Sequence, residues 1–404
     1  MKVFEVGGCV RDQLLGLTPK DFDYVVVGAT VEQMLDLGYQ MVGESFPVFL
    51  HPVSGEEYAL ARTERKTGMG YHGFTCEFSP TVTLEDDLKR RDLTINAMAR
   101  DVETGEIIDP YGGARDLKNR VLKHVSSHFS DDPVRAIRLA RFAARYHFLG
   151  FVIDETTKSF VNDMIVAGEL DHLVPERVWE EFTKAMKSDF ALFIQYLHEL
   201  KILHVLLPEV SALDGVIQPP QHHPEVDTFV HTVMCVQQAQ RLTTTPEVWW
   251  AALMHDLGKG ITPKDELPRH LMHEKRGVPL VRNVCERYKV PTSFKELALM
   301  VCEYHLDCHK VKEFKPSTLV KRFRQYDAYR KPERFEMFLL ACEADARGRT
   351  GLEDHEYDQA DYFRKMFEVA KSVKFADLNN PNMEPSKIQE ALDRLRIQRI
   401  QQLK

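Results

Sequence analysis

The stretch from Gly7 to Gly28, GGCVRDQLLGLTPKDFDYVVVG, decides the fold of the N-terminal part of the chain. An apolar run precedes the Gly-Gly pair, a short helical pattern follows it, and Asp21 and Asp23 then open a run of strand-forming residues. Residues i and i+2 of a strand project to the same face, so the two carboxylates are predicted to lie side by side at the start of a strand. Neighbouring carboxylates repel one another unless a cation lies between them. The pair therefore predicts a Mg²⁺ site that also carries substrate phosphates.

The Gly-Gly pair predicts a phosphate-binding turn. Gly7 and Gly8 lack a Cβ, so their N–H groups can approach a triphosphate, and the helix that begins near Val10 directs its positive end to the same place. Arg11 adds a charge-assisted contact. A lone Gly-Gly or Asp-x-Asp is usually a turn, but the succession of strand, Gly-Gly, helix, Asp-x-Asp and strand is much more specific. The stretch resembles the class II nucleotidyltransferases of the DNA polymerase β superfamily, which include bacterial poly(A) polymerases and tRNA CCA-adding enzymes.

Composition limits the organisation of the chain. Its 404 residues suit two or three domains, and 44% hydrophobic residues can bury a core. No apolar run reaches transmembrane length and the N-terminus leads directly into a strand pattern, so we expect a cytoplasmic protein. The seven cysteines show no C-x-x-C spacing, which favours reduced thiols. The net charge of −8 argues against a generally basic nucleic-acid binder, although basic residues cluster at 89–91, 135–145 and 321–334.

Residues 1 to about 110 alternate strand-like and helix-like segments. A helical stretch at 30–37 precedes strand candidates at 39–42, 48–51 and 57–61, which fits a small mixed sheet flanked by helices. Glu56 or Glu57 is a candidate third carboxylate, but the class II enzymes manage with the Asp-x-Asp pair, so neither is assigned a role. The charged, Gly-rich segment 62–74 is either a mobile loop that repositions substrates, as the resemblance implies, or a hairpin connection.

Residues 84–96, LEDDLKRRDLTIN, are predicted to form one helix. In it Arg91 and Asp92 are neighbours, while Asp92 and Asn96 share a face at i and i+4. A guanidinium suits a triphosphate and a carboxylate accepts from ribose hydroxyls. RRD-x-x-x-NA resembles the family's ribose-selecting motif; a polar pair on an exposed helix is the alternative. The following IIDPYGG at 107–113 is predicted to be a strand end and a structural turn.

The motif SDDPVRAIRLARF at 130–142 predicts a helix with Asp at the N-cap and Pro at N1. Arg135, Arg138 and Arg141 stay roughly on one face, where three guanidiniums repel unless an anion lies across them. The motif resembles the family's E/D-D-x-x-R-x-x-R. By that resemblance Asp132 and Arg135 would read the base, while Arg138 and Arg141 would bind phosphate or position the nucleotide. One carboxylate with one guanidinium admits cytosine and adenine and rejects uracil and guanine, without a template. The plain alternative for Asp132 is an N-cap, a role that Asp131 could fill instead.

The C-terminal half carries a second constellation. An apolar helix that ends in HDLGKG at 255–260 resembles the HD metal-dependent phosphohydrolases. By that resemblance the metal ligands are His231, His255, Asp256 and, further along the chain, Asp345. His270, His273 and His305 are candidate accessory ligands or phosphate contacts, and no role is assigned to His222, His223 and His309. Neutral imidazoles with carboxylates suit a transition metal such as Ni²⁺ or Mn²⁺, which activates a bound water for attack on a phosphoester.

The motifs together predict an α+β fold: a polymerase β-like nucleotidyltransferase head with a small mixed sheet, then an all-α body and an all-α HD domain. The predicted boundaries are 1–125 for the head, 126–222 for the helical body with the base-reading helix, 223–350 for the HD domain and 351–404 for a helical tail. Residues 219–224 are expected to be a linker. The basic and aromatic segment 321–334 is either a tRNA-contacting surface or a solvated helix face with buried aromatics.

The order of these parts resembles the tRNA CCA-adding enzymes that carry a C-terminal HD module. The resemblance implies that the head adds C, C and A to tRNA 3′ ends from CTP and ATP, with Mg²⁺ on Asp21 and Asp23. It implies 2′,3′-cyclic phosphodiesterase, 2′-nucleotidase and phosphatase activity for the HD module. We expect tRNA, CTP and ATP as partners, no membrane, and a monomer or homodimer. A poly(A) polymerase, which shares the head motifs but lacks this HD module, is the nearest alternative, and an HD nucleotide phosphohydrolase with a vestigial head is the second.

Overall fold

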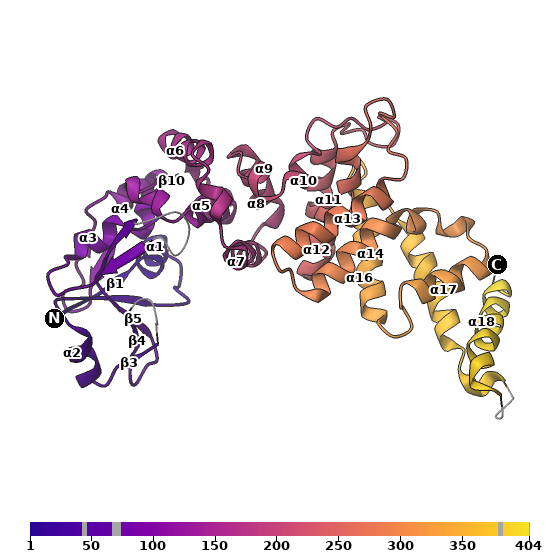
Figure 1. The fold of residues 1–404 in the computed structure, drawn as a ribbon, viewed down its shortest axis with the longest axis horizontal. Helices are drawn as coiled ribbons and strands as arrows, with labels where there is room; N and C mark the ends of the chain where they lie inside the picture. The colour runs from indigo at the N-terminus through magenta and orange to yellow at the C-terminus, as the bar shows by residue number, and fades with distance from the viewer. Residues whose placement is uncertain (43–46, 67–73, 379–382, 404) are drawn as a thin grey trace. The chain divides into compact units, whose positions relative to one another are not determined.

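The computed structural model describes residues 1–42, 47–66, 74–378 and 383–403, and the chain divides into two compact units, Met1–Leu206 and Leu207–Lys404 (Figure 1). The division falls ahead of the predicted boundary between body and HD domain at residue 222. The finer division into four parts stays a prediction. Among the described residues, no helix combines the length and the apolar character needed to cross a membrane.

The first unit is built on a mixed sheet that has seven strands within the described ranges, in the order β3-β4-β5-β2-β1-β8-β9. In that order the strands are β3 (Gln40–Met41), β4 (Val48–Leu50), β5 (Glu57–Leu60), β2 (Asp23–Val27), β1 (Lys2–Val6), β8 (Ala99–Asp101) and β9 (Ile107–Ile108). β2 and β5 run parallel, and the other neighbours are antiparallel. The three strands predicted after the first helical stretch are present as β3, β4 and β5.

Alternating side chains give this sheet two apolar faces. Val25 packs with Phe4 in one buried cluster, whereas its neighbour Val26 packs with Phe49 and Met34 in the other. Successive strand residues project to opposite faces, so the valine run of β2 contributes to both clusters. Met34 comes from α2 (Val31–Asp36), which begins with a capping box as the helical pattern predicts.

The register of β1 and β2 brings the two motifs of the opening stretch together. Val6, the last residue of β1, pairs with Asp23, the first residue of β2. Gly7 and α1 (Gly8–Leu14) therefore begin at the edge of the sheet where Asp23 lies. On the other side of β2, the parallel β5 sets Glu57 in register with Asp23.

Two predicted elements differ from the structure. The helix predicted over 84–96 is wrong in its extent, because α3 (Leu84–Lys89) stops early and only a short 3₁₀ helix, η1 (Thr94–Asn96), follows. Between them Leu93 bridges to His124, and such tertiary contacts override local helical propensity. In the segment 62–74, β6 (Thr63–Lys66) and β7 (Phe74–Glu77) pair antiparallel as the hairpin alternative predicts. The centre of the predicted mobile loop, 67–73, lies outside the described residues.

The remainder of the first unit is helical, apart from the short parallel pair β10 (Val121–Leu122) and β11 (Val152–Ile153). Its helices are α4 (Gly113–Asn119), α5 (Val134–Tyr146), α6 (Glu155–Val166), α7 (Pro175–Ala185), α8 (Phe190–Glu199) and α9 (Leu203–Leu206). α5 packs against α7 and α8. Asp109 accepts hydrogen bonds from the backbone N–H groups of Gly113 (2.7 Å) and Ala114 (2.9 Å), so the predicted turn holds the start of α4.

Where the structure describes it, the second unit is all-α. Its helices are α10 (Pro208–Ser211), α11 (Thr228–Leu242), α12 (Pro246–Met254), α13 (His273–Arg287), α14 (Thr292–His309), α15 (Pro316–Gln325), α16 (Pro332–Arg347), α17 (Asp358–Ser372) and α18 (Pro385–Gln401). α14 packs against α12, α13 and α16, and α11 against α12 and α16. In the segment 321–334, Phe323 and Tyr326 are buried, which agrees with the alternative of a helix face with buried aromatics. All seven cysteines are free thiols.

Candidate functional site

The first unit contains a cavity of about 660 Å³ between the edge of the sheet, α5 and α7. Every residue predicted to act in the head lines this cavity except Asp21: Gly8, Arg11, Asp23, Arg91, Asp92, Asp132, Arg135, Arg138 and Arg141. Side chains from motifs far apart in the sequence thus face one space. Glu57, the register partner of Asp23, lines it as well.

The Asp-x-Asp pair is placed differently from the prediction. β2 begins at Asp23, and Asp21 lies two residues ahead of the strand, so the pair spans the start of β2 instead of lying within it. Although the Asp23 side chain is exposed at the cavity, the surrounding protein raises its pKa, first by desolvation and further by the charge of Asp21, while Arg91 acts in the opposite direction. A divalent cation held by these oxygens would relieve the repulsion, so the donors fit Mg²⁺.

The Gly-Gly turn lies against two guanidiniums. Gly7 has a φ of 74°, and a Cβ there would lie 3.0 Å from Nη1 of Arg91, so the turn requires glycine. Arg91 donates to Asp87 at 3.1 Å. Arg11 donates from Nη1 to Oδ1 of Asn96 at 2.5 Å. Protein acceptors therefore orient both guanidiniums beside the turn, and a triphosphate would have to bind their other N–H groups or displace these partners.

The arginines of α5 pair with carboxylates of the protein itself. Arg138 contacts Oδ2 of Asp92 through Nε (2.8 Å) and Nη2 (2.7 Å), and Nε of Arg141 donates to Glu181 at 2.6 Å. Burial alone would raise the pKa of Asp92, but Arg138 and the Asn96 amide outweigh it and hold that pKa well below its usual range. The arginines on one face of α5 were expected to need a nearby anion. The carboxylates of Asp92 and Glu181 supply part of that negative charge.

The two residues expected to read the base also have partners. Oδ1 of Asp132 accepts from the backbone N–H of Val134 at 3.3 Å, a capping contact at the start of α5, although the N-cap residue of that helix is Pro133 and not an Asp as predicted. Both oxygens of Asp132 also accept from Arg177, at 2.9 and 2.7 Å. Asp131 does not cap the helix and instead contacts His128 at 2.7 Å, and Arg135 donates to the carbonyl of that histidine at 2.5 Å. Sequence reasoning missed Arg177 and Glu181, because the sequence of α7 shows a helical pattern but no motif.

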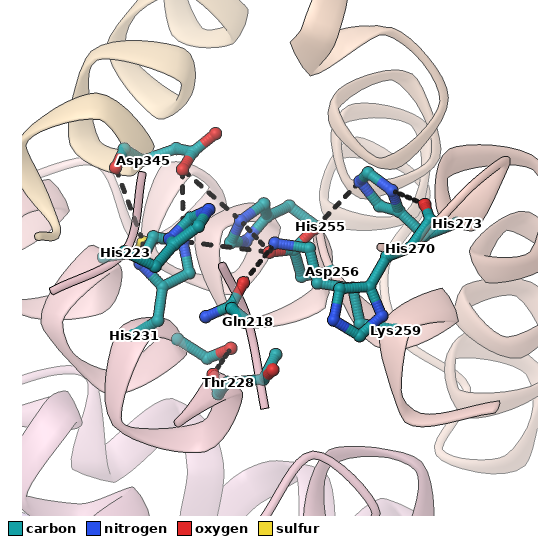
Figure 2. A network of polar contacts seen from close by, with 12 residues as sticks. Gln218, His223, Thr228, His231, His255, Asp256, Lys259, His270, His273 and Asp345 are labelled. Atoms are coloured by element: carbon teal, nitrogen blue, oxygen red, sulfur yellow. Dashed lines mark hydrogen bonds and ion pairs between the residues drawn. The ribbon is translucent and has the colours of Figure 1, made fainter. Parts of the chain in front are cut away.

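The second cluster lies inside the helical unit (Figure 2). His231 comes from α11, His255 and Asp256 from the end of α12, and Asp345 from α16; all four are buried. Nε2 of His231 lies 3.2 Å from Oδ1 of Asp345, and Nε2 of His255 lies 3.1 Å from Oδ2 of Asp256. The crossed pairs, His231 with Asp256 and His255 with Asp345, are each 3.8 Å apart. The structure therefore brings all four predicted ligands together.

These separations and the state of the donor atoms fit a divalent ion. Ligand atoms about 2.1 Å from one ion stand about 3.0 to 3.5 Å apart at right or tetrahedral angles. Within the described residues, Nε2 of His255 and both carboxylate oxygens of Asp256 have no hydrogen-bond partner, although Nζ of Lys259 forms an ion pair with Asp256 at 2.6 Å. Buried polar atoms without hydrogen bonds are rare in proteins. The cluster thus has the donors that a bound metal ion would satisfy.

Backbone carbonyls orient the imidazoles. Four Nδ1 atoms lie close to carbonyl oxygens: His231 to Gly348 (2.9 Å), His255 to Ala252 (2.7 Å), His273 to His270 (2.8 Å) and His305 to Val301 (3.0 Å). A carbonyl oxygen only accepts, so we assign the proton to each Nδ1, which leaves each Nε2 with a lone pair. The rings are held in the tautomer that binds metal through Nε2.

Two of the three accessory histidines reach the cluster. His273 and His305 lie 3.3 and 3.7 Å from Oδ1 of Asp256 and 3.2 Å from each other. Burial lowers the pKa of His305 to about 3, so this ring is neutral. The ring nitrogens of His270 instead contact Thr262 (2.8 Å) and the carbonyl of Ile217 (3.1 Å), so the structure does not place its side chain among the ligand atoms.

Two contributors were missed from the sequence. His309, which was assigned no role, lies with Nε2 2.7 Å from Oδ2 of Asp345; its spacing of four residues from His305 was the available signal. Oε1 of Glu225 lies 3.0 Å from Nδ1 of His231 and 3.0 Å from Nδ1 of His223. These groups fix the orientation of two predicted ligands from outside the cluster.

The glycine of HDLGKG is required for packing. A Cβ at Gly258 would lie 1.9 Å from the carbonyl oxygen of His273 and 2.7 Å from the amide nitrogen of Gly277. α13 therefore approaches the turn after Asp256 at backbone distance. This close approach places His273 beside Asp256.

Comparisons with known proteins agree with both sites. The family model "Poly A polymerase head domain" matches residues 3–123, "Probable RNA and SrmB- binding site of polymerase A" matches 150–213, and "HD domain" matches 228–334. The multifunctional CCA protein of Thioalkalivibrio sulfidiphilus is 53% identical over 405 residues, covering 100% of this chain and 99% of that protein. The chain belongs to the family of multifunctional CCA proteins. The family and the enzyme class predicted from the sequence are thereby confirmed, and divalent metal ions are expected in both parts.

Solved structures share the fold of this family member. A CCA-adding enzyme in complex with ATP has a TM-score of 0.66 at 21% identity, covering 99% of this chain and 86% of that chain. The CCA-adding enzyme of Thermotoga maritima in complex with tRNA has a TM-score of 0.62 at 20% identity, covering 99% and 87%. The predicted fold class, a head with a mixed sheet followed by helical parts, is confirmed.

Proposed function

We propose that this protein adds and repairs the 3′-terminal CCA of tRNA from CTP and ATP and releases diphosphate. The observation that carries the proposal is one cavity lined by Asp23, by the ribose motif around Asp92 and by the pair Asp132 and Arg135. Membership of the family over the full chain supports it. A tRNA substrate also favours the cytoplasmic location expected from the sequence.

Asp21 and Asp23 hold Mg²⁺, which when bound lowers the pKa of the tRNA 3′-hydroxyl and neutralises charge on the leaving diphosphate. Gly8 and Arg11 bind the triphosphate at the start of α1. Arg138 and Arg141 position the nucleotide from α5. Each of these residues except Asp21 lines the cavity.

Ribose and base selection require protein contacts to be exchanged for nucleotide contacts. Asp92 accepts from the backbone N–H of Leu93 (2.8 Å) and from Asn96 (3.0 Å) on one oxygen, and contacts Arg138 twice on the other. A ribose hydroxyl must therefore take the place of one donor, with Arg91 beside it on the triphosphate. Asp132 must likewise share or release Arg177 before it accepts from the amino group of cytosine or adenine, while Arg135 donates to the ring nitrogen.

Incorporation of labelled nucleotides tests this function. tRNAs that end before CCA, after CC and after CCA are each incubated with one labelled NTP and Mg²⁺. We expect CTP to extend the first, ATP to extend the second once, and the third to remain unchanged. Repeated addition of AMP to all three would identify a poly(A) polymerase instead.

We also propose that the cluster around His255 and Asp256 binds a transition metal ion, Ni²⁺ or Mn²⁺, and hydrolyses phosphoesters. The activities expected are 2′,3′-cyclic phosphodiesterase, 2′-nucleotidase and phosphatase. His231, His255, Asp256 and Asp345 hold the ion, which when bound lowers the pKa of a water molecule. Support comes from Nε2 of His255 and the Asp256 oxygens, which have no hydrogen-bond partner among the described residues, and from the oriented Nε2 atoms.

Hydrolysis of 2′,3′-cyclic AMP tests the second activity. The full chain is assayed after removal of metal with EDTA and after addition of Ni²⁺, Mn²⁺ or Mg²⁺ separately. We expect activity to return with a transition metal and not with Mg²⁺. Activity that survives EDTA unchanged would overturn the proposal for this cluster.

A further inference from the structure

A buried thiol accompanies the four predicted ligands of the metal cluster. Cys235 lies one helical turn after His231 on α11, and residues at i and i+4 of a helix project to the same side. Its Sγ lies 3.4 Å from Nε2 of His231, the atom that faces the cluster. One donor atom from each of Cys235, His231, His255 and Asp345 lies within 4.8 Å of the other three. The helix thus presents an imidazole and a thiol to the same point.

The groups opposite this thiol point to a ligand. Nε2 of His255, a fully buried ring, has no hydrogen-bond partner among the described residues, and it belongs to the same set of donor atoms as the sulfur. Sγ itself makes long contacts, to the ring of His231 and to the carbonyl oxygen of Asp345 at 3.9 Å. A buried cysteine often serves only as a small apolar side chain, but this one faces nitrogen and oxygen donors.

The distances fit coordination of one ion. A nitrogen about 2.1 Å and a sulfur about 2.3 Å from one ion lie about 3.1 Å apart at a right angle and about 3.6 Å apart at the tetrahedral angle. The separation of Sγ from Nε2 of His231 is 3.4 Å. The backbone leaves room for the sulfur at Gly348, where a Cβ would lie 2.5 Å from Sγ. The carbonyl of that glycine holds Nδ1 of His231, so one residue accommodates the thiol and orients the imidazole.

We propose that Cys235 is a further ligand of the metal ion in this cluster and that its thiolate makes the site select Ni²⁺, Co²⁺ or Zn²⁺ over Mn²⁺ and Mg²⁺. On binding, the S–H bond breaks, a metal–sulfur bond forms and the proton passes to solvent. Thiolate ligands favour the softer divalent ions, whereas oxygen donors suit Mg²⁺ and Mn²⁺. The inference rests on the proposal that this cluster binds a metal and is independent of nucleotide addition by the head.

Metal titration of the full chain tests the inference. Metal-free wild type, Cys235→Ser and Cys235→Ala are titrated with Co²⁺, Ni²⁺ and Mn²⁺ by calorimetry and absorption spectroscopy. Cys285→Ser is the matched control, because it removes a buried thiol of α13 that belongs to none of the candidate metal-binding groups in the described part of the chain. CCA addition by the same preparations and circular dichroism show that each variant is folded.

We expect a sulfur-to-Co²⁺ charge-transfer band in the wild type and the control, and its loss in both Cys235 variants. The Ni²⁺ affinity of these variants should fall by about 10-fold or more, since even outer-shell changes cost about 10- to 100-fold, while the Mn²⁺ affinity should change far less. Equal Ni²⁺ affinities in wild type and variants, with no charge-transfer band in the wild type, would overturn the ligand role and leave the metal centre standing. Failure of the wild type to bind any of the three ions would overturn both the ligand role of Cys235 and the proposed metal centre.

Discussion

The two candidate sites differ in how their charged groups are partnered before any ligand binds. In the head cavity, Asp92 is paired with Arg138 and Asp132 with Arg177. In the buried cluster, backbone carbonyls hold the outer nitrogens of His231 and His255, while the inner atoms face one another within 4 Å. On the proposed functions, the first site exchanges these partners when its substrate arrives, and the second is arranged to receive an ion.

This difference explains why each site suits its chemistry. If the head selects its nucleotide as proposed, the free energy of selection is the difference between the hydrogen bonds within the protein and those to the base, so a wrong base would leave a charged group unpaired. In the buried cluster the lone pairs are fixed and offer the same geometry to any ion of suitable size. The choice of metal must therefore depend on whether the ligand atoms are nitrogen, oxygen or sulfur. The predictions that follow separate the two sites, from the largest expected effect to the smallest.

Replacing Asp23 by Ala should abolish CCA addition and leave hydrolysis by the HD domain unchanged. Loss of a carboxylate of the Mg²⁺ site removes several kcal/mol of transition-state stabilisation, which corresponds to roughly 1,000-fold or more in rate. Both activities are measured on the same preparation, with Asp36→Ala, an exposed carboxylate of α2, as the control. Full addition by the Asp23 variant would show that Asp23 is not a ligand of the Mg²⁺ ion that the reaction needs.

Replacing His255 by Ala should have the reciprocal effect. It removes one of the oriented Nε2 atoms, so the affinity for Ni²⁺ should fall by more than the roughly 10- to 100-fold that outer-shell changes cost. CCA addition should continue at the wild-type rate. Calorimetric titration measures the affinity, and His222→Ala, an exposed histidine of the same unit, serves as the control. A parallel loss of addition in the His255 variant would mean that the two sites are not independent.

Replacing Asp132 by Ala should reduce selectivity rather than abolish addition. Loss of one hydrogen bond to a charged group corresponds to about 10- to 100-fold in the preference for CTP over UTP. The ratio of the two incorporation rates is the measurement, because loss of the helix cap would slow both nucleotides alike. Asp131→Ala, which loses only the contact with His128, should keep the ratio. An unchanged ratio in the Asp132 variant would assign the residue to capping alone.

Replacing Asp109 by Ala should lower the stability of the first unit without changing either site. The variant loses the two backbone hydrogen bonds at the start of α4, so the free energy of unfolding of the first unit should fall by about 1 kcal/mol. Urea denaturation measures it, with Glu103→Ala, an exposed side chain, as the control. The hydrolase activity should be unaffected. A larger fall in CCA addition than in stability would give this turn a part in the reaction.

Much of the fold and both groups of candidate residues could be predicted because their signals are local. Gly-Gly, Asp-x-Asp and HDLGKG are short motifs, and the strands of the head follow a period of two. The pairing of Val6 with Asp23, which unites the first two motifs, needed only adjacent strands in the sequence. The start of β2 at Asp23 could not be predicted, because an alternating pattern does not say at which residue a strand begins.

The partners of these residues could not be predicted, because they come from distant parts of the chain. Arg177 and Glu181 belong to a helix whose sequence shows only amphipathic spacing, yet they neutralise Asp132 and Arg141. The helix predicted over 84–96 failed for the same reason, since the contact of Asp92 with Arg138 on α5 is invisible in a local window. The contact of His309 with Asp345 could not be predicted either, because a single histidine outside a motif does not indicate its partner.

The carbonyl oxygens that hold the four imidazoles belong to the helices and loops of the second unit itself. If the cluster binds an ion as proposed, a chelator should strip it while the rings keep their orientation, and another element should enter without refolding. The element recovered with the purified enzyme should then depend on which of the ions that the site accepts are supplied by the growth medium and the columns. Any comparison of hydrolase rates between preparations should begin with elemental analysis of each sample.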